Sequence, residues 1–252
     1  MMLLEARNLS VAFGGIKAVD EVSFGVAPGE IFTIIGPNGA GKTTIFNLVS
    51  RIYNPTGGDI FYGGQAITRV APQAVARLGI ARTFQNIELF DHASVVDNIL
   101  VGCHVKVRSG ILSELLFTPG VRRQEMEFRR KVEEIIEFLE LEHHRDAPIA
   151  SLSYGIRKVV EIGRALALGP KLLLLDEPSS GLNPEETEDM VHWIRDIRDD
   201  LGVTVIMVEH DMTLVRRVSD RVLALESGRV LALGDADQVI SDPRVVRAYL
   251  GD

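Results

Sequence analysis

The sequence predicts an α/β protein with a mostly parallel sheet, an antiparallel β part near the N-terminus and a helical subdomain inserted into the chain. Three observations support this prediction. Short, continuous apolar runs indicate buried strands. Apolar residues with a helical period dominate the middle of the chain. The α/β alternation then returns, so we expect one domain, 1–252, with a core formed by 1–85 and 169–252 and a helical subdomain at 86–168.

The first part of the chain predicts strands followed by one helix. Strand-like runs extend over Leu3–Phe13 and Glu21–Val26, and the turn-forming pair Gly14-Gly15 separates them. Ile31–Ile35 is a compact apolar run with β-branched residues, which predicts a buried strand. A helix is predicted from Lys42 to about Val49.

Helical signals dominate from about Gln85 to Leu168. Within this part, Gly102–Glu125 has no clean period and contains the turn signal Thr118-Pro119-Gly120. A clear apolar helix face follows, with residues spaced at i, i+3, i+4 and i+7: Val132, Ile135, Ile136 and Leu139.

The α/β alternation returns with two apolar runs, Leu172–Leu175 and Val203–Val208, which predict buried strands. Between them a helix start is predicted, with Asn183 as N-cap, Pro184 at the first helical position and Glu186 at the third. The apolar stripe of this helix consists of Met190, Trp193, Ile194, Ile197 and Leu201. Two further apolar runs joined by a short turn predict a hairpin, Val222–Leu225 and Val230–Leu233.

Composition excludes several classes of protein. No stretch approaches the roughly 20 apolar residues that span a bilayer. The N-terminus lacks the pattern of a secretory signal, so we expect a cytoplasmic protein. Cys103 is the single cysteine, which excludes an internal disulfide and a cysteine zinc cluster. Lys and Arg total 27 against 35 Asp and Glu, and this net charge of −8 argues against nucleic acid as a partner.

Gly36–Thr43 fits the phosphate-loop pattern G-x-x-x-x-G-K-[ST] at every fixed position, between a predicted strand and a predicted helix. Glycines let backbone N–H groups turn toward a polyanion, and the helix N-terminus adds a positive field. Lys42 supplies a charge for the phosphates and Thr43 a hydroxyl for Mg²⁺, so ATP and Mg²⁺ are the predicted ligands. The predicted nucleotide-binding residues of the loop are Gly36, Pro37, Asn38, Gly39, Ala40, Gly41, Lys42, Thr43 and Thr44.

Two acids, Asp176 and Glu177, follow the predicted strand at 172–175. Ligands of open α/β sheets bind at the carboxyl ends of the strands, so both acids are expected beside the phosphates. We predict that Asp176 holds Mg²⁺, directly or through its water shell, and that Glu177 polarises or deprotonates the attacking water. Without the phosphate loop, an acidic pair that ends a strand before a turn would be an equally good interpretation.

Leu152-Ser153-Tyr154-Gly155 opens a predicted helix shortly before that strand. By itself this segment indicates a serine-capped helix, although a serine and a glycine there can also form a second anion site. Together with the phosphate loop and the two acids, it resembles the signature motif of the ATP-binding subunit of an ABC transporter. The resemblance covers essentially the whole chain and implies the P-loop NTPase fold of ABC ATPases.

The resemblance implies roles for further residues. Ser153 and Gly155 match the signature positions that contact the γ-phosphate across a head-to-tail dimer. Gln85 matches the Q-loop glutamine, a catalytic and Mg²⁺-binding residue, and His210 matches the switch histidine that bonds the γ-phosphate. Phe13 matches the aromatic residue that stacks on adenine. Taken alone, these three residues also fit a surface amide, a structural histidine and a core aromatic. The chain departs from the commonest family pattern at Tyr154, Ile156 and Asn183.

Within that family the chain most resembles the branched-chain amino acid importer group, through residues 152–155, 181–187 and 247–251. The segment at about 102–125 resembles the longer of that system's two ATPase types. The resemblance implies a second ATPase subunit, two transmembrane permease subunits and, indirectly, an extracytoplasmic solute-binding protein, with this chain at the cytoplasmic face of the cell membrane.

Several alternatives remain open. ATPases of urea or amide importers and of lipopolysaccharide exporters are also similar. Non-transport ABC ATPases that act on ribosomes or DNA usually carry two such domains or a long coiled coil, whereas this chain has one phosphate loop and no heptad run. The departures at Ile156 and Asn183 leave room for a catalytically weak subunit.

Residues 104–131 carry a local net charge of +4 in an otherwise acidic chain, because seven basic residues oppose three acids. We hypothesise that this segment faces anionic headgroups or the cytoplasmic loops of the membrane subunits. A solvated helix face is the simpler interpretation. The basic residues are Lys106, Arg108, Arg122, Arg123, Arg129, Arg130 and Lys131, and the acids are Glu114, Glu125 and Glu127.

Overall fold

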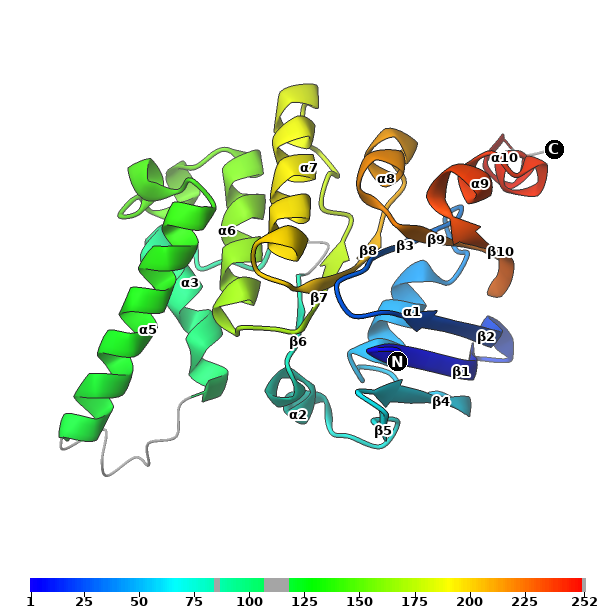
Figure 1. The fold of residues 1–252 in the computed structure, drawn as a ribbon, viewed down its shortest axis with the longest axis horizontal. Helices are drawn as coiled ribbons and strands as arrows, with labels where there is room; N and C mark the ends of the chain where they lie inside the picture. Colours follow the sequence, from blue (N-terminus) through cyan, green and yellow to red (C-terminus); the bar gives the residue numbers. More distant parts are fainter. Residues whose placement is uncertain (84–86, 107–117, 251–252) are drawn as a thin grey trace. The chain divides into compact units, whose positions relative to one another are not determined.

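The computed structural model describes residues 1–83, 87–106 and 118–250 (Figure 1). The chain divides into two compact units. Unit 1 consists of Met1–Arg82 and Lys171–Asp252, and unit 2 consists of Thr83–Pro170. Unit 2 is therefore an insertion between two halves of unit 1.

Unit 1 begins with an antiparallel sheet in the order β2-β1-β4-β5. β1 (Leu4–Phe13) pairs with both β2 (Ile16–Val26) and β4 (Gly57–Tyr62), and β4 pairs with the short β5 (Gln65–Ala66). The predicted antiparallel β part is confirmed. The second strand begins at Ile16, five residues earlier than the apolar pattern predicted, and its first two residues are exposed at the hairpin end.

The second sheet of unit 1 has the order β10-β9-β3-β8-β7-β6. Four of its five strand pairings are parallel, and only β10 runs antiparallel to its neighbour β9. Every residue of β3, β7 and β8 is buried, as the continuous apolar runs predicted. The strands are β3 (Ile31–Ile35), β6 (Ile80–Arg82), β7 (Leu172–Asp176), β8 (Thr204–Val208), β9 (Arg221–Glu226) and β10 (Arg229–Asp235).

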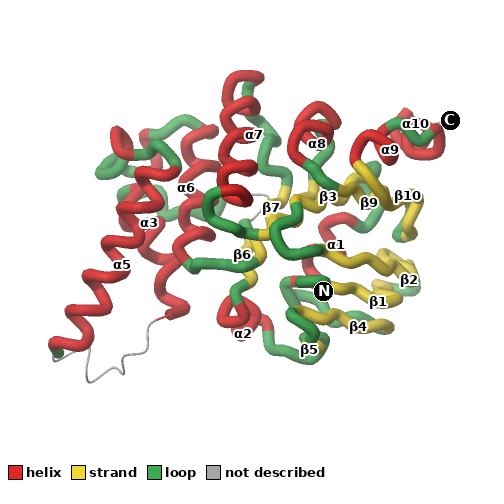
Figure 2. Tube along the Cα trace, viewed as in Figure 1, coloured by secondary structure: helices red, strands yellow, loops and turns green. Residues whose placement is uncertain are grey.

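Helices cover the second sheet on both faces (Figures 1 and 2). α1 (Lys42–Val49) packs between the two sheets, because its apolar residues share one core cluster with strands of both. A second cluster joins β9 to α8, α9 and α10 on the other face. The remaining helices of unit 1 are α2 (Pro72–Val75), η1 (Ala76–Leu78), α7 (Pro184–Asp199), α8 (Met212–Val218), α9 (Ala236–Ile240) and α10 (Pro243–Leu250).

Helix α7 begins as its sequence predicts. The Asn183 side chain accepts a hydrogen bond from the backbone N–H of Glu186 at 2.9 Å, and the Glu186 carboxylate accepts one from the N–H of Asn183 at 3.0 Å. Pro184 occupies the first turn. This reciprocal cap satisfies backbone donors that the helix itself cannot pair. Of the predicted apolar stripe, Leu201 lies beyond the helix and is exposed.

Unit 2 is helical. α3 (Val95–Val101), α5 (Pro119–Phe138) and α6 (Tyr154–Ala167) pack against one another in pairs. The predicted apolar face of α5 is buried in this cluster. Short turns complete the described part of the unit: η2 (Gly102–Lys106), η3 (Glu142–His144) and η4 (Ile149–Ser151).

One local prediction is wrong. Thr118-Pro119-Gly120 does not form a turn between elements but begins α5, with Thr118 as N-cap and Pro119 in the first helical turn. Proline is tolerated there because its missing N–H needs no helical partner and its φ already suits the helix. Among the described residues, no helix combines the length and the apolar composition that crossing a membrane requires.

Candidate functional site

The phosphate-loop segment leaves the buried strand β3 and enters helix α1. Two of its glycines cannot be replaced without moving the backbone. A Cβ on Gly36 would lie 2.4 Å from the carbonyl oxygen of Leu225, and one on Gly41 would lie 2.5 Å from that of Ala18. Gly41 also has a φ of 102°, which side chains rarely adopt. The sheet therefore packs so closely around the loop that glycine is required at both positions.

Lys42 folds back into the loop that precedes it. Its Nζ donates to the carbonyl oxygens of Gly36 at 2.7 Å and Pro37 at 3.1 Å, and the side chain is buried. Burial lowers the pKa of Lys42 below its ordinary value, and the nearby carboxylates Glu177 and Asp176 act in the opposite direction. The two predicted acids are therefore close enough to the predicted lysine for their charges to act on it.

The start of α1 suits an anion. Gly41 is its N-cap, and no side chain within the described segments caps the helix there. Backbone N–H groups at a helix start need acceptors, and phosphate oxygens can supply them. Thr43 is exposed and Thr44 half-buried at this end, while Asn38 and Gly39 lie exposed on the loop. Pro37 is half-buried and Ala40 is buried.

Asp176 and Glu177 lie at the carboxyl end of β7. Asp176 is the last residue of the strand and is almost fully buried. Glu177 has a φ of 50°, in the left-handed region that costs a non-glycine residue about 1–2 kcal/mol. Its backbone N–H donates to the carbonyl oxygen of Val208 at 2.9 Å, which fixes the turn that follows the strand. Unusual backbone of this kind is often retained at functional sites.

The oxygen donors at this edge fit a magnesium ion. Thr43 offers a hydroxyl and Asp176 a carboxylate, and both are the hard oxygen ligands that Mg²⁺ prefers. Mg²⁺ typically takes few protein ligands and completes its shell with water and phosphate oxygens. Gln85, the third predicted ligand, lies outside the described residues.

His210 follows β8 at the same edge, and its side chain is exposed. It is positioned by Glu209, a fully buried acid that the sequence motifs did not indicate. One carboxylate oxygen of Glu209 accepts from Ser179, through the backbone N–H at 2.9 Å and the hydroxyl at 2.6 Å. The other accepts from the backbone N–H groups of His210 at 2.8 Å and Asp211 at 3.2 Å. Glu209 therefore links the turn after β7 to the turn after β8.

Tyr249, on the last helix, also reaches the phosphate loop. The backbone N–H of Gly36 donates to the Tyr249 hydroxyl at 2.6 Å. Burial of the phenol raises the pKa of Tyr249 to about 12, with a smaller opposing effect from the hydrogen bond with Gly36. The sequence pattern singled out the segment 247–251 only as a family feature, and nothing local indicates this contact across the chain.

The remaining predicted residues belong to other segments of the chain. Phe13 is exposed at the end of β1, and its ring meets the Tyr53 ring edge to face at 5.1 Å between centroids. In unit 2, Ser153 is the N-cap of α6 and accepts from the backbone N–H of Ile156 at 3.3 Å. Gly155 is buried in the first turn of that helix. A serine at this exposed helix start has a hydroxyl that a ligand can reach, but the same geometry suits an ordinary cap.

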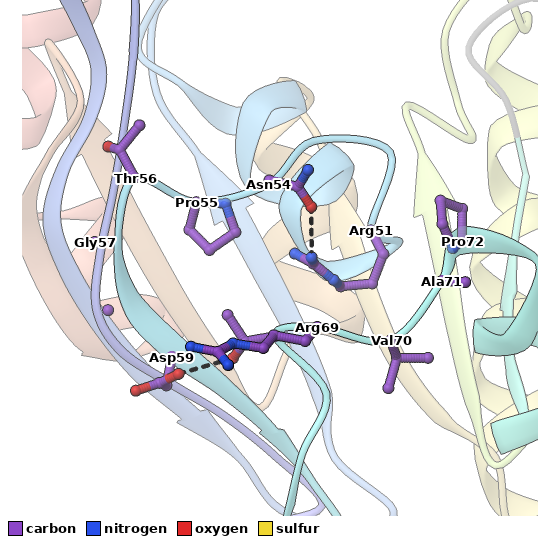
Figure 3. Close-up of a pocket in the computed structure, with 12 residues that line it drawn as sticks. Arg51, Asn54, Pro55, Thr56, Gly57, Asp59, Arg69, Val70, Ala71 and Pro72 are labelled. Atoms are coloured by element: carbon purple, nitrogen blue, oxygen red, sulfur yellow. Dashed lines mark hydrogen bonds between the residues drawn. The ribbon is translucent and has the colours of Figure 1, made fainter.

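A separate pocket of about 530 Å³ lies between the segment that follows α1, the start of β4 and the segment before α2 (Figure 3). Arg51 lines one side of the pocket and donates to the Asn54 side chain at 2.7 Å. Thr68 donates to Asp59 at 3.0 Å at the far side. None of the predicted site residues lines this pocket, so it is not part of the predicted nucleotide site.

The chain resembles known proteins along nearly its whole length. Residues 19–180 match the family model of the ABC transporter, and residues 229–252 match that of the branched-chain amino acid ATP-binding cassette transporter. The chain is 40% identical over 250 residues to the high-affinity branched-chain amino acid transport ATP-binding protein LivG of Escherichia coli (strain K12), covering 99% of this chain and 98% of that protein. It is 39% identical over 250 residues to BraF of Pseudomonas aeruginosa, with the same coverage.

Solved structures show the same fold. The ADP conformation of MJ1267, an ATP-binding cassette of an ABC transporter, matches with a TM-score of 0.88 and 33% identity over 100% of both chains. A nucleotide-free ATP-binding cassette from an ABC transporter matches with a TM-score of 0.87 and 32% identity, again over 100% of both chains. With the family match and these full-length relatives, the chain belongs to the ABC transporter family and is one of its ATP-binding subunits, an ATPase.

Proposed function

We propose that this chain is the ATP-hydrolysing motor subunit of a transporter that imports branched-chain amino acids. The observation that carries the proposal is the match at the C-terminus, residues 229–252, to the model of the branched-chain amino acid cassettes. The full-length relatives whose names refer to branched-chain amino acid transport support the same assignment. The transported molecule need not touch the motor, so sequence likeness is the main guide to it.

In the proposed mechanism, the phosphate loop holds ATP. The backbone N–H groups of Gly39, Gly41 and the start of α1 are directed to the phosphates, and Lys42 exchanges its two carbonyl contacts for phosphate oxygens. That exchange is favourable because an ammonium bonds an anionic oxygen more strongly than a neutral carbonyl. Phe13, exposed at the end of β1, offers a ring face to the adenine.

Hydrolysis is assigned to Glu177, which takes or polarises the proton of the attacking water. His210, held through the backbone by Glu209, donates to the γ-phosphate. Mg²⁺ bound by Thr43, Asp176 and Gln85 would neutralise charge that develops on the phosphate oxygens. Each of these side chains other than Gln85 belongs to unit 1, so one unit carries the water-activating and metal-binding groups.

The assembly follows from the signature. Ser153 and Gly155 of each subunit are proposed to contact the γ-phosphate bound by a second ATPase subunit, so that ATP closes the pair and hydrolysis reopens it. Two transmembrane permease subunits at the membrane and, indirectly, an extracytoplasmic solute-binding protein complete the system. The chain would then work as a peripheral protein at the cytoplasmic face of the membrane.

The composition of the complex tests this proposal first. A tagged Glu177→Gln variant, expressed in the native host, should retain ATP and hold the complex closed during solubilisation with ATP present. We expect two membrane subunits and a second ATPase to co-purify. Two membrane subunits without a second, different ATPase would indicate a homodimeric motor and weaken the importer assignment. Ribosomes, DNA-bound proteins or no membrane protein would contradict it.

Uptake of labelled leucine, isoleucine and valine tests the substrate. Vesicles that contain the purified complex and its solute-binding protein should accumulate these amino acids only with ATP inside. The Lys42→Ala variant is the matched control, because it should assemble without binding nucleotide. Accumulation of urea or a short amide instead, with no amino acid uptake, would contradict the substrate assignment and leave the ATPase assignment intact.

A further inference from the structure

Strand β6 ends in Arg82, a cation that no sequence motif indicates and that contacts the predicted magnesium ligand. Its Nη2 donates to Oδ2 of Asp176 at 2.8 Å. The two side chains are only 10% and 1% exposed. Charges that are shielded from water interact much more strongly than exposed ones. This ion pair is therefore a strong influence on what else the Asp176 carboxylate can bind.

Helix α1 holds the same guanidinium from another side. Nη1 of Arg82 donates to Oδ1 of Asn47 at 2.7 Å and to Oγ of Ser50 at 2.9 Å. The central carbon of the guanidinium lies 5.6 Å from the centroid of the Phe46 ring. These contacts fix the cation independently of the carboxylate. The helix that anchors Arg82 also carries Thr43, the other predicted magnesium ligand, in its first turn.

We propose that Arg82 is a positioning residue that competes with Mg²⁺ for Asp176 and so sets the Mg²⁺ concentration that nucleotide binding requires. The inference rests on the proposed role of Asp176 as a metal ligand. A carboxylate that already balances a fixed cation offers less negative potential to a divalent ion. The guanidinium also repels any cation that approaches the same carboxylate.

This arrangement favours metal binding together with nucleotide. Without nucleotide, Arg82 and Lys42 are two positive groups near the site, and Mg²⁺ meets a carboxylate that is already paired. Phosphate oxygens bring enough negative charge to offset both cations and to share the metal. Arg82 therefore lowers the affinity of the empty site for the ion more than it lowers the affinity of the nucleotide-loaded site.

The test is a Mg²⁺ titration of nucleotide binding. Binding of a fluorescent ADP derivative to the purified chain is measured over a range of Mg²⁺ concentrations, so that hydrolysis plays no part. For Arg82→Met, which removes the charge and keeps a similar volume, the Mg²⁺ concentration at half-maximal binding should fall by about tenfold. If Arg82→Met does not fold, Arg82→Gln removes the same charge and retains a hydrogen-bonding side chain.

Two variants serve as controls. Arg221→Met removes a matched arginine, whose Nη1 pairs with Glu30 at 3.1 Å and whose guanidinium lies 5.6 Å from the Phe32 ring, at the start of β9. Its Mg²⁺ midpoint should equal that of the unmodified chain. Arg82→Lys keeps the charge but lacks the forked donors, and its midpoint should stay within about twofold.

An unchanged or higher midpoint in Arg82→Met would overturn the inference. An equal fall in Arg82→Lys would also overturn it, because geometry rather than charge would then decide the metal affinity.

Asp176→Asn separates this inference from the proposed function. If Asp176→Asn leaves the Mg²⁺ midpoint unchanged, the metal role of Asp176 is wrong and the inference falls with it. If that variant raises the midpoint while Arg82→Met does not lower it, only the role of Arg82 is wrong.

Discussion

The carboxyl-end edge of the parallel sheet in unit 1 and helix α5 in unit 2 both concentrate charge, but they hold it in opposite ways. At the sheet edge, Lys42, Asp176 and Glu209 are buried. Lys42 donates to carbonyl oxygens of the loop that precedes it, whereas Asp176 and Glu209 accept hydrogen bonds from residues distant in the sequence. On α5, the side chains of Arg129 and Arg130 are 66% and 83% exposed and pair with acids one turn away.

The difference follows from desolvation. A buried charge is costly unless its partners are already in place, so the sheet edge is a preorganised site. Exposed pairs on a helix contribute only a few tenths of a kcal/mol each, so the charges of α5 can exchange partners at little cost. The comparison predicts large effects from small changes at the sheet edge and small effects on stability from large changes on α5.

The largest effect is expected for Glu177→Gln. The amide cannot accept the proton of the attacking water, so steady-state ATP hydrolysis by the assembled transporter should fall by about 100-fold or more. Nucleotide binding should persist, because the side chain is nearly isosteric. Phosphate release and equilibrium ATP binding, measured on the same preparation, distinguish the two effects.

Lys42→Ala is the contrasting variant for that experiment. Loss of the ammonium should abolish ATP binding itself, so its low turnover has a different cause. A Glu177→Gln transporter that hydrolyses ATP at the normal rate would show that another group activates the water.

The next largest effect is expected for Glu209→Gln. Four donors surround this buried carboxylate. In the variant, one carboxylate oxygen becomes an –NH₂ group, which cannot accept hydrogen bonds from the donors that it faces. We expect the free energy of unfolding to fall by about 2 kcal/mol. Urea unfolding of the purified chain measures this change.

Glu226→Gln is the matched control for that measurement, because Glu226 is an exposed acid at the end of β9. It should change the free energy of unfolding by less than about 0.5 kcal/mol. Equal effects of the two variants would mean that the buried network contributes nothing special to stability.

A smaller effect is expected for Tyr249→Phe. The buried N–H of Gly36 loses its acceptor, at a cost of about 1 kcal/mol. The phosphate loop should become less well ordered, and ATP affinity should fall by about fivefold in a calorimetric titration. Tyr62→Phe is the control, because the Tyr62 hydroxyl is buried with no hydrogen-bond partner among the described residues. An equal loss of affinity in both variants would refute the link.

The smallest effect on the isolated chain is expected on α5. Neutralising Arg122, Arg123, Arg129 and Arg130 should leave soluble ATPase activity unchanged and stability within about 1 kcal/mol, because exposed pairs contribute little. If the positive segment faces headgroups or permease loops, association with membranes that contain the permeases should weaken. Membrane association equal to that of the unmodified chain would contradict this role.

The sequence predicted the elements that have strong local patterns. The apolar run 31–35 is β3, and the cap at Asn183 begins α7 as expected. Strand β6 was not predicted, because three residues are too few to show a period, and α10 was noted only as a family feature. Thr118-Pro119-Gly120 was assigned to a turn because proline and glycine are common in turns. Proline is equally at home in the first turn of a helix, and the dipeptide alone does not distinguish the two.

The residues of the candidate site also differ in whether a local sequence pattern indicates them. Lys42 was predicted because a phosphate loop requires certain residue types at fixed spacing, and Asp176 and Glu177 because they end an apolar strand. Arg82, Glu209 and Tyr249 act through partners that are 94, 30 and 213 positions distant, and a single sequence carries no signal of such contacts. The roles of all these predicted residues, including Phe13, Gln85, His210, Ser153 and Gly155, stay predictions, because they depend on a bound nucleotide, a metal ion or a second subunit.

The hydrogen bond from Gly36 to Tyr249 also affects when the site can form during synthesis. A ribosome delivers Gly36 213 residues before Tyr249, so the phosphate loop emerges long before the hydroxyl that accepts its hydrogen bond. Strand β3 likewise has to wait for β8 and β9, its neighbours on either side. The nucleotide site of the nascent chain therefore stays incomplete until helix α10 has left the ribosome.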